Sequence, residues 1–171
     1  MELTDKELVL RQFKDSDSKR IAELCNNRKI WDNVRDFLPF PYTEKDAVDF
    51  INSCKSEIPP VTFVIEFDRE LAGCIGFVPQ KDIYRLSAEI GYWIGEPYWG
   101  RGIATKAVKL LAGYGFKNLD LVRIYSGVFD YNLASQRVLE KAGFKLEGIF
   151  EKSVIKNGII RDEYRYALIR P

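Results

Sequence analysis

The stretch Ser87–Thr105 has the sequence SAEIGYWIGEPYWGRGIAT, and its pattern changes at two closely spaced glycines. Its first part, up to Gly95, is rich in β-branched and aromatic residues and predicts a strand. Gly100 and Gly102 follow, and a helical pattern begins near Ile103. Glycines let the backbone approach a ligand closely, and the unpaired amides of a first helical turn attract anions. The stretch predicts a pyrophosphate site, although a turn of this kind can also bind nothing.

A second segment that bears on function is NLASQRVLEKAGF at residues 132–144. It predicts a helix with Asn132 as its N-cap and Gly143 just past its end. Taken alone, Asn132 and Ser135 are ordinary residues for a helix start. The turn at 100–102 matches neither the G-x-G-x-x-G dinucleotide fingerprint nor the Gly-Lys-Ser/Thr of a Walker A loop.

Outward from these segments, the pattern predicts one single domain over residues 1–171 in the order β-α-α-β-β-β-α-β-α-β-β. We expect a mixed α+β fold with a mainly antiparallel sheet of about seven strands and helices on both faces. Thr43 and Asp46 form a capping box, and Asn157-Gly158 is a hairpin turn. Expected strands lie at 8–13, 61–67, 71–79, 87–95 and 119–129 and on both sides of that turn, and expected helices begin at 15, 43, 103 and 132.

Composition narrows the possible classes of protein. The chain has 26 basic and 25 acidic residues, a balance that argues against nucleic-acid or membrane-surface binding. No apolar run approaches the ~20 residues of a membrane span, and the charged N-terminus does not resemble a secretory signal, so we expect a cytoplasmic protein. The three cysteines, at 25, 54 and 74, fit reduced buried thiols.

The chain contains no histidine. This excludes Ser-His-Asp and Cys-His catalysis and any histidine-ligated zinc, and we expect no metal. Proton transfer must therefore use carboxylates, tyrosine, serine, lysine, water or a co-substrate.

Together the two segments resemble the GNAT superfamily of N-acetyltransferases. WGRGIA is similar to the Q/R-x-x-G-x-G/A coenzyme loop, with Trp99 where Gln or Arg is usual, and 132–144 is similar to the helix beside the pantetheine arm. AEIGYWI, WGRGIAT, N-x-x-S-x-x-V, GFKLEG, the Asn-Gly turn and a closing D-x-x-x-Y-A resemble, in order, the RimJ/RimL branch of ribosomal-protein N-terminal acetyltransferases. The resemblance covers almost the whole chain.

The resemblance implies acetyl-CoA as co-substrate and assigns residues to it. Backbone groups of Tyr92, Trp93 and Ile94 would bond pantetheine, because that strand splays from its neighbour at a bulge. Asn132 would bond the pantetheine arm, and Ser135 is placed like the general acid proposed for RimL-like enzymes. The pyrophosphate would lie on backbone amides of Gly100, Arg101, Gly102, Ile103, Ala104 and Thr105.

The general base is the least determined role. In two branches of the family a catalytic Glu stands at positions that align with Gly127 and Val154, which cannot act. Glu89 is the remaining carboxylate, on the strand face of Gly91 and Trp93, and it is either the base or a buried structural partner of an Arg or Lys. The tyrosine acid of many members is Leu139 here, so Ser135 or Tyr131 would replace it.

The acceptor is a primary amine, with a protein N-terminal α-amine favoured and a small amine such as a polyamine, amino acid or antibiotic as the alternative. A non-catalytic coenzyme-A-binding module is a further alternative. Residues 31–42 and 150–153 are expected to form the amine pocket. Within it, Arg35 and Asp36 are candidate contacts or merely an ion pair. A homodimer is possible.

Overall fold

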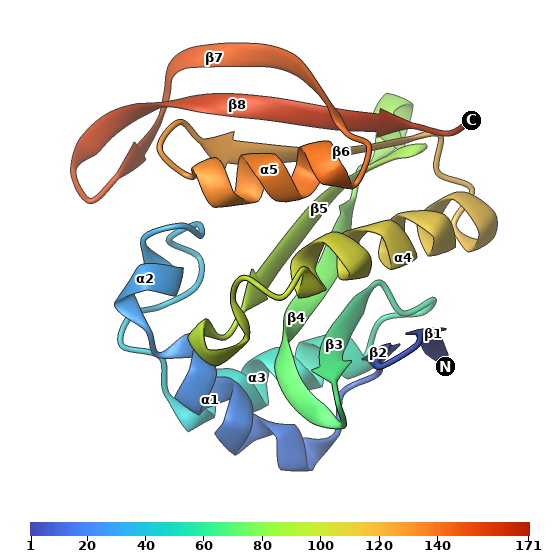
Figure 1. The fold of residues 1–171 in the computed structure, drawn as a ribbon, viewed down its shortest axis with the longest axis vertical. Coiled ribbons are helices and arrows are strands. Elements are labelled where there is room, and N and C mark those ends of the chain that lie inside the picture. Colours follow the sequence, from blue (N-terminus) through green and yellow to red (C-terminus); the bar gives the residue numbers. More distant parts are fainter.

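The computed structural model describes residues 1–171 as one open sheet flanked by helices (Figure 1). The strands are β1 Glu2–Asp5, β2 Leu8–Arg11, β3 Thr62–Phe67, β4 Glu70–Pro79, β5 Ser87–Ile94, β6 Arg123–Phe129, β7 Lys145–Lys156 and β8 Ile159–Ile169. The α-helices are α1 Ser18–Cys25, α2 Arg28–Trp31, α3 Glu44–Lys55, α4 Ile103–Asn118 and α5 Leu133–Lys141.

The sheet has eight strands in the order β1-β2-β3-β4-β5-β6-β8-β7. Every neighbouring pair is antiparallel except β5 and β6, which are parallel. The mixed, mainly antiparallel fold predicted from the sequence is therefore confirmed. The single parallel pair is the point at which the chain crosses over through α4, as a parallel connection requires.

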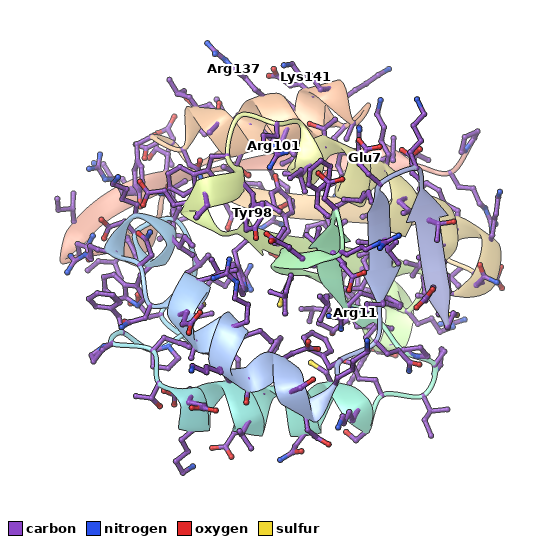
Figure 2. All side chains as sticks on the ribbon, turned by 60° about the horizontal axis from the view of Figure 1, so that its bottom comes forward. Glu7, Arg11, Tyr98, Arg101, Arg137 and Lys141 are labelled. Atoms are coloured by element: carbon purple, nitrogen blue, oxygen red, sulfur yellow. The ribbon has the colours of Figure 1, made fainter.

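Helices cover both faces of the sheet, as predicted. α4 and α5 lie side by side on one face, and α1 and α3 lie on the opposite side of the strands (Figure 2). Between these layers, apolar side chains of the strands and helices form one continuous core, in which Phe63, Ile75 and Leu111 are almost fully buried. The three cysteines are free and buried within this core, as expected.

Local end signals in the sequence correspond closely to the observed ends. Thr43 and Asp46 form the predicted capping box at the start of α3, with the Asp46 amide 3.2 Å from the Thr43 hydroxyl oxygen. Gly143 follows α5 with φ of 96°. Asn157 and Gly158, both with positive φ, make the turn between β7 and β8, which fits the type I′ preference of Asn-Gly.

The predictions for the N-terminal region need three corrections. β1 is an additional, mostly exposed edge strand whose residues lack an apolar alternation, so no pattern announces it. The helix expected at 15–27 is a 3-10 turn followed by α1, because the Asp17 carboxylate accepts hydrogen bonds from the Lys14 amide and from Arg11. A short helix, α2, precedes the expected loop at 31–42.

None of the helices is both long and apolar enough to cross a membrane. The cytoplasmic location and the possible homodimer stay predictions.

Candidate active site

The sheet opens between β5 and β6. These two strands pair only from Ser87 to Glu89 on β5, and beyond this point each continues without the other. The predicted splay is therefore present. The predicted bulge is not, because Ala88–Ile94 pairs with β4 in continuous register. Beyond Glu89, β5 stays paired with β4 and β6 stays paired with β8, so only the short parallel contact holds β5 to β6.

The backbone groups of β5 point alternately to its two neighbours. Gln80 N donates to Ser87 O at 3.0 Å and Gly95 N donates to Ala72 O at 2.8 Å, so the odd-numbered residues between them bond β4. In agreement with this, the Trp93 carbonyl points toward Gly73 of β4. A Cβ added to Gly73 would lie 2.2 Å from the Trp93 carbonyl oxygen. Tyr92 and Ile94 direct their N–H and C=O groups into the opening, whereas Trp93, expected to share that role, faces β4.

Trp99, the residue at which the coenzyme loop departs from the usual pattern, is bonded to the end of β5. Its indole Nε1 donates to the Ile94 carbonyl at 2.7 Å. One backbone acceptor of the opening is therefore already occupied by a side chain of the adjoining loop. The ring itself remains 44% exposed beside Gly100.

The glycine turn has the backbone that the sequence predicts. Gly100 and Gly102 both adopt φ of 75°, and Gly102 is the N-cap of α4. A Cβ at either position would meet nothing within 4 Å, so the space above the turn is open. The Arg101 guanidinium lies 4.7 Å from the centre of the Phe67 ring and 3.7 Å from the Asp68 carboxylate. Ile103 is buried, while Ala104 and Thr105 are half-buried in the first turn of α4.

The start of α5 reaches the same opening. The Asn132 side-chain oxygen accepts a hydrogen bond from the Ser135 backbone amide at 3.1 Å, which caps the helix. The side-chain nitrogen Nδ2 of Asn132 remains available as a donor. The Ser135 hydroxyl lies 2.8 Å from the Tyr92 hydroxyl. Burial raises the pKa of Tyr92 to about 12, so this phenol is protonated at neutral pH. α5 also carries Arg137 and Lys141, which point away from the sheet (Figure 2).

Glu89 lies on the opposite face of β5 from Tyr92, because successive strand side chains alternate. Its side chain is 14% exposed, and its Oε1 accepts a hydrogen bond from the Arg35 guanidinium. The Glu89 charge also helps, together with burial as the larger cause, to raise the pKa of Tyr125 on β6. The structure is compatible with both roles considered for Glu89. Its arginine partner fits a structural ion pair, and its place beside the opening fits a general base.

The expected acceptor loop at 31–42 is held by the tip of the β7–β8 hairpin. Asp36 pairs at 2.6 Å with Lys156, whose side chain is 1% exposed and whose ammonium lies 3.6 Å from the Trp31 ring centre. Tyr131 donates a hydrogen bond to the Asp32 carbonyl. Arg35 and Asp36 are thus both ion-paired, one to β5 and the other to the hairpin.

Sequence reasoning missed Glu163 on β8. Its carboxylate lies over Gly127 on β6, and a Cβ at Gly127 would come within 2.6 Å of it. No local signal announces this contact, because it depends on the register between β6 and β8, which pairs Glu163 with Phe129. No group of three or more His, Cys, Asp or Glu side chains converges anywhere to hold a metal ion.

Comparison with known proteins is consistent with this geometry. A family model described as an acetyltransferase (GNAT) domain matches residues 7–145. The chain is 33% identical over 171 residues to YnaD of Bacillus subtilis (strain 168), an uncharacterized N-acetyltransferase, covering 99% of this chain and 97% of YnaD. It is 29% identical over 162 residues to the spermidine N(1)-acetyltransferase of Escherichia coli (strain K12), covering 94% and 85% of the two chains.

Among solved structures, the fold is similar to RimL, a ribosomal L7/L12 alpha-N-protein acetyltransferase, in complex with coenzyme A. The TM-score is 0.86 with 23% sequence identity, covering 99% of this chain and 98% of that one. At this identity the likeness shows a shared fold, and it confirms the predicted resemblance to RimL at that level.

Proposed function

The chain belongs to the GNAT family of acetyltransferases and is an N-acetyltransferase, and from this premise we propose that it moves the acetyl group of acetyl-CoA directly to an α-amine at a protein N-terminus. The observation that carries the proposal is the opening between β5 and β6. Two hydroxyls, of Tyr92 and Ser135, meet on one face of it, and the Glu89 carboxylate lies on the other. A proton donor and a proton acceptor on opposite sides of one gap suit acyl transfer.

The residues present fit the coenzyme. Backbone amides from Gly100 to Thr105, in the positive-φ turn and the first turn of α4, would hold the pyrophosphate. These groups are unpaired donors at the positive end of a helix. Tyr92 and Ile94 would bond the pantetheine through the backbone groups that point into the opening. The Asn132 amide nitrogen would donate to the same arm. The thioester supplies an activated acetyl group.

On the acceptor side, Glu89 would remove a proton from the amine, directly or through a water molecule. At pH 7, deprotonating a lysine-like amine of pKa near 10.4 costs about 4.6 kcal/mol, whereas an α-amine of pKa near 8 costs about 1.4 kcal/mol. A carboxylate is a weak base, so it is better matched to the α-amine. The uncharged amine nitrogen then forms the new N–C bond and gives up a second proton to a water molecule as the amide forms, while an amide of the splayed strand β5 would donate to the oxyanion.

On the coenzyme side, Ser135 would give its hydroxyl proton to the sulfur as the C–S bond breaks. The Tyr92 hydroxyl at 2.8 Å can restore that proton, and solvent can restore the one lost by Tyr92. A thiolate with a pKa of about 8.5 needs only a weak acid, so hydroxyls are sufficient donors.

The preference for a peptide α-amine rests on charge. Glu89 and Glu163 are each paired with an arginine, so these carboxylates do not leave a strongly acidic surface for a polyamine. RimL, which shares the fold, acts by its name on a protein α-amine, while the relative at 29% identity is named for spermidine. A small polyamine acceptor is therefore the second candidate.

A thiol-release screen with acetyl-CoA tests the proposal. The acceptors are peptides with a free N-terminal Ala, Ser or Met, the same peptides blocked at the N-terminus but carrying an internal Lys, and spermidine. We expect turnover with the free peptides, acetylation at the α-amine by mass spectrometry, and a kcat/KM for the blocked peptides at least tenfold lower. A higher kcat/KM for spermidine than for every peptide would overturn the preference, and no thiol release with any amine would overturn the function.

A further inference from the structure

The space directly over Gly127 is occupied by a carboxylate from another strand. An ideal Cβ on Gly127 would stand 2.6 Å from both Cδ and Oε2 of Glu163, well inside any normal contact distance. Glu163 comes from β8, and its side chain is only 13% exposed. Glycine at 127 is therefore what allows this carboxylate to lie against the backbone of β6.

This carboxylate lies at the mouth of the opening, on the acceptor side. Cross-strand partners project their side chains from the same face of a sheet. Glu89 pairs with Tyr125, Gly127 is two residues further along β6, and Phe129 beyond it pairs with Glu163. Glu89, the space over Gly127 and Glu163 thus share one face. Gly127 also lies past the last β5–β6 pair, where the two strands have separated.

The two oxygens of Glu163 differ in their surroundings. Oε1 accepts two hydrogen bonds from Arg165, at 3.1 Å from Nε and 2.5 Å from Nη2. The guanidinium is held in turn over the Phe150 ring, with 4.2 Å from its carbon to the ring centre. Oε2 accepts no hydrogen bond. Every fully buried side-chain nitrogen or oxygen in the structure has a hydrogen-bond partner, so Oε2 is not fully buried and is accessible. This accessible oxygen is the one nearest to Gly127.

We infer that Oε2 of Glu163 binds the acceptor amine in its ammonium form, so that Glu163 contacts the substrate and helps determine specificity. Arg165 fixes the carboxylate through the other oxygen, and Gly127 provides the room for it. An ammonium bound there lies on the same face as Glu89, the proposed base. One accessible oxygen suits a single charged amine, and this inference rests on the proposed function and refines its acceptor.

Steady-state kinetics with the best acceptor of the screen tests the inference, using Glu163→Gln, Gly127→Ala and the double variant. Glu147→Gln is the matched control, because Glu147 is also paired with an arginine, Arg123, from the closed end of β6. We expect Glu163→Gln to raise the acceptor KM roughly tenfold at pH 7, with kcat within about twofold and acetyl-CoA affinity unchanged in calorimetry. The control should change nothing beyond about twofold.

Gly127→Ala should displace the same carboxylate without changing its chemistry, because the added Cβ must push the Glu163 side chain aside. We expect it to raise the acceptor KM as well, and the double variant to be no worse than Glu163→Gln alone, as coupled residues behave. The KM difference between wild type and Glu163→Gln should also narrow at pH 9.5, where an α-amine of pKa about 8 is uncharged.

A wild-type KM in Glu163→Gln, or the same rise in Glu147→Gln, would overturn the inference while wild-type turnover still supports the proposed function. Wild-type enzyme without turnover on any amine would overturn both.

Discussion

The two faces of the sheet at the β5–β6 opening are built from different kinds of group. On the face proposed to bind the coenzyme, called the coenzyme face, there are backbone amides, hydroxyls and a helix cap, contributed by β5, the turn at 100–102 and the start of α5. The face proposed to bind the acceptor, called the acceptor face, carries two carboxylate–guanidinium pairs, Glu89 with Arg35 and Glu163 with Arg165. The first face is polar but uncharged around its hydroxyls, and the second is charged but balanced.

The difference matches the ligand proposed for each face. A pyrophosphate is well bound by fixed backbone dipoles, which need no side chain to change its protonation. An amine must arrive as an ammonium and lose a proton, so its side needs carboxylates. Variants on the two faces should therefore separate coenzyme binding from acceptor chemistry.

The largest effect is expected from Gly102→Glu on the coenzyme face. The side chain would project into the open space above the turn and place a negative charge at the proposed pyrophosphate site. We expect acetyl-CoA binding to be undetectable by calorimetry. Gly102→Ala is the control, because it carries the same backbone strain at φ of 75° without the bulk or charge. Wild-type affinity in Gly102→Glu would remove the turn from the coenzyme site.

The next effect is expected from Glu89→Gln on the acceptor face. It keeps the shape of the side chain and removes its basicity, so kcat/KM should fall by roughly 10²-fold or more with coenzyme affinity intact. The loss should shrink as pH rises, because the amine then deprotonates by itself. Arg35→Gln is the matched variant, since it removes the partner and keeps the carboxylate. If Arg35→Gln lowers kcat/KM as much as Glu89→Gln does, and Glu89→Gln keeps the pH profile of wild type, then Glu89 has a structural role.

The smallest of the three is expected from Ser135→Ala. A thiolate leaves readily, so kcat should fall only about tenfold, with acetyl-CoA affinity within about twofold. Tyr92→Phe should also lower kcat, by a smaller factor than Ser135→Ala.

The pH dependence of wild type adds a check on the same hydroxyls. Because burial raises the pKa of Tyr92 to about 12, its hydroxyl stays protonated as the pH rises past the ordinary value of 10.0. The rate should accordingly show no decline between pH 9 and pH 11. A decline there, or a wild-type kcat in Ser135→Ala, would contradict this role for the two hydroxyls.

The local backbone geometry of the proposed coenzyme face could largely be predicted from the sequence, because each of its parts is set by a few consecutive residues. The positive φ of Gly100 and Gly102 and the cap at Asn132 are properties of a few consecutive residues. The exception is Trp93. Its backbone was expected to face the opening, and the direction of a strand's N–H groups depends on which residues pair with the neighbouring strand.

The acceptor face could be predicted only in part. Glu89 and the loop at 31–42 follow from the pattern, but their partners do not. The pairing of Glu89 with Arg35 depends on how that loop folds back over β5, which no local pattern determines.

By itself, the sequence determined the order of the elements from α3 onward, the caps and turns that end them, and the glycine turn at the start of α4. These depend on backbone sterics and on hydrogen bonds within a few residues. Only the tertiary structure decided that Glu163 lies over Gly127 and which backbone groups of β5 face the opening. Both depend on strand register, which is set by the packing of the whole sheet, and a shift of one residue would turn every side chain to the other face.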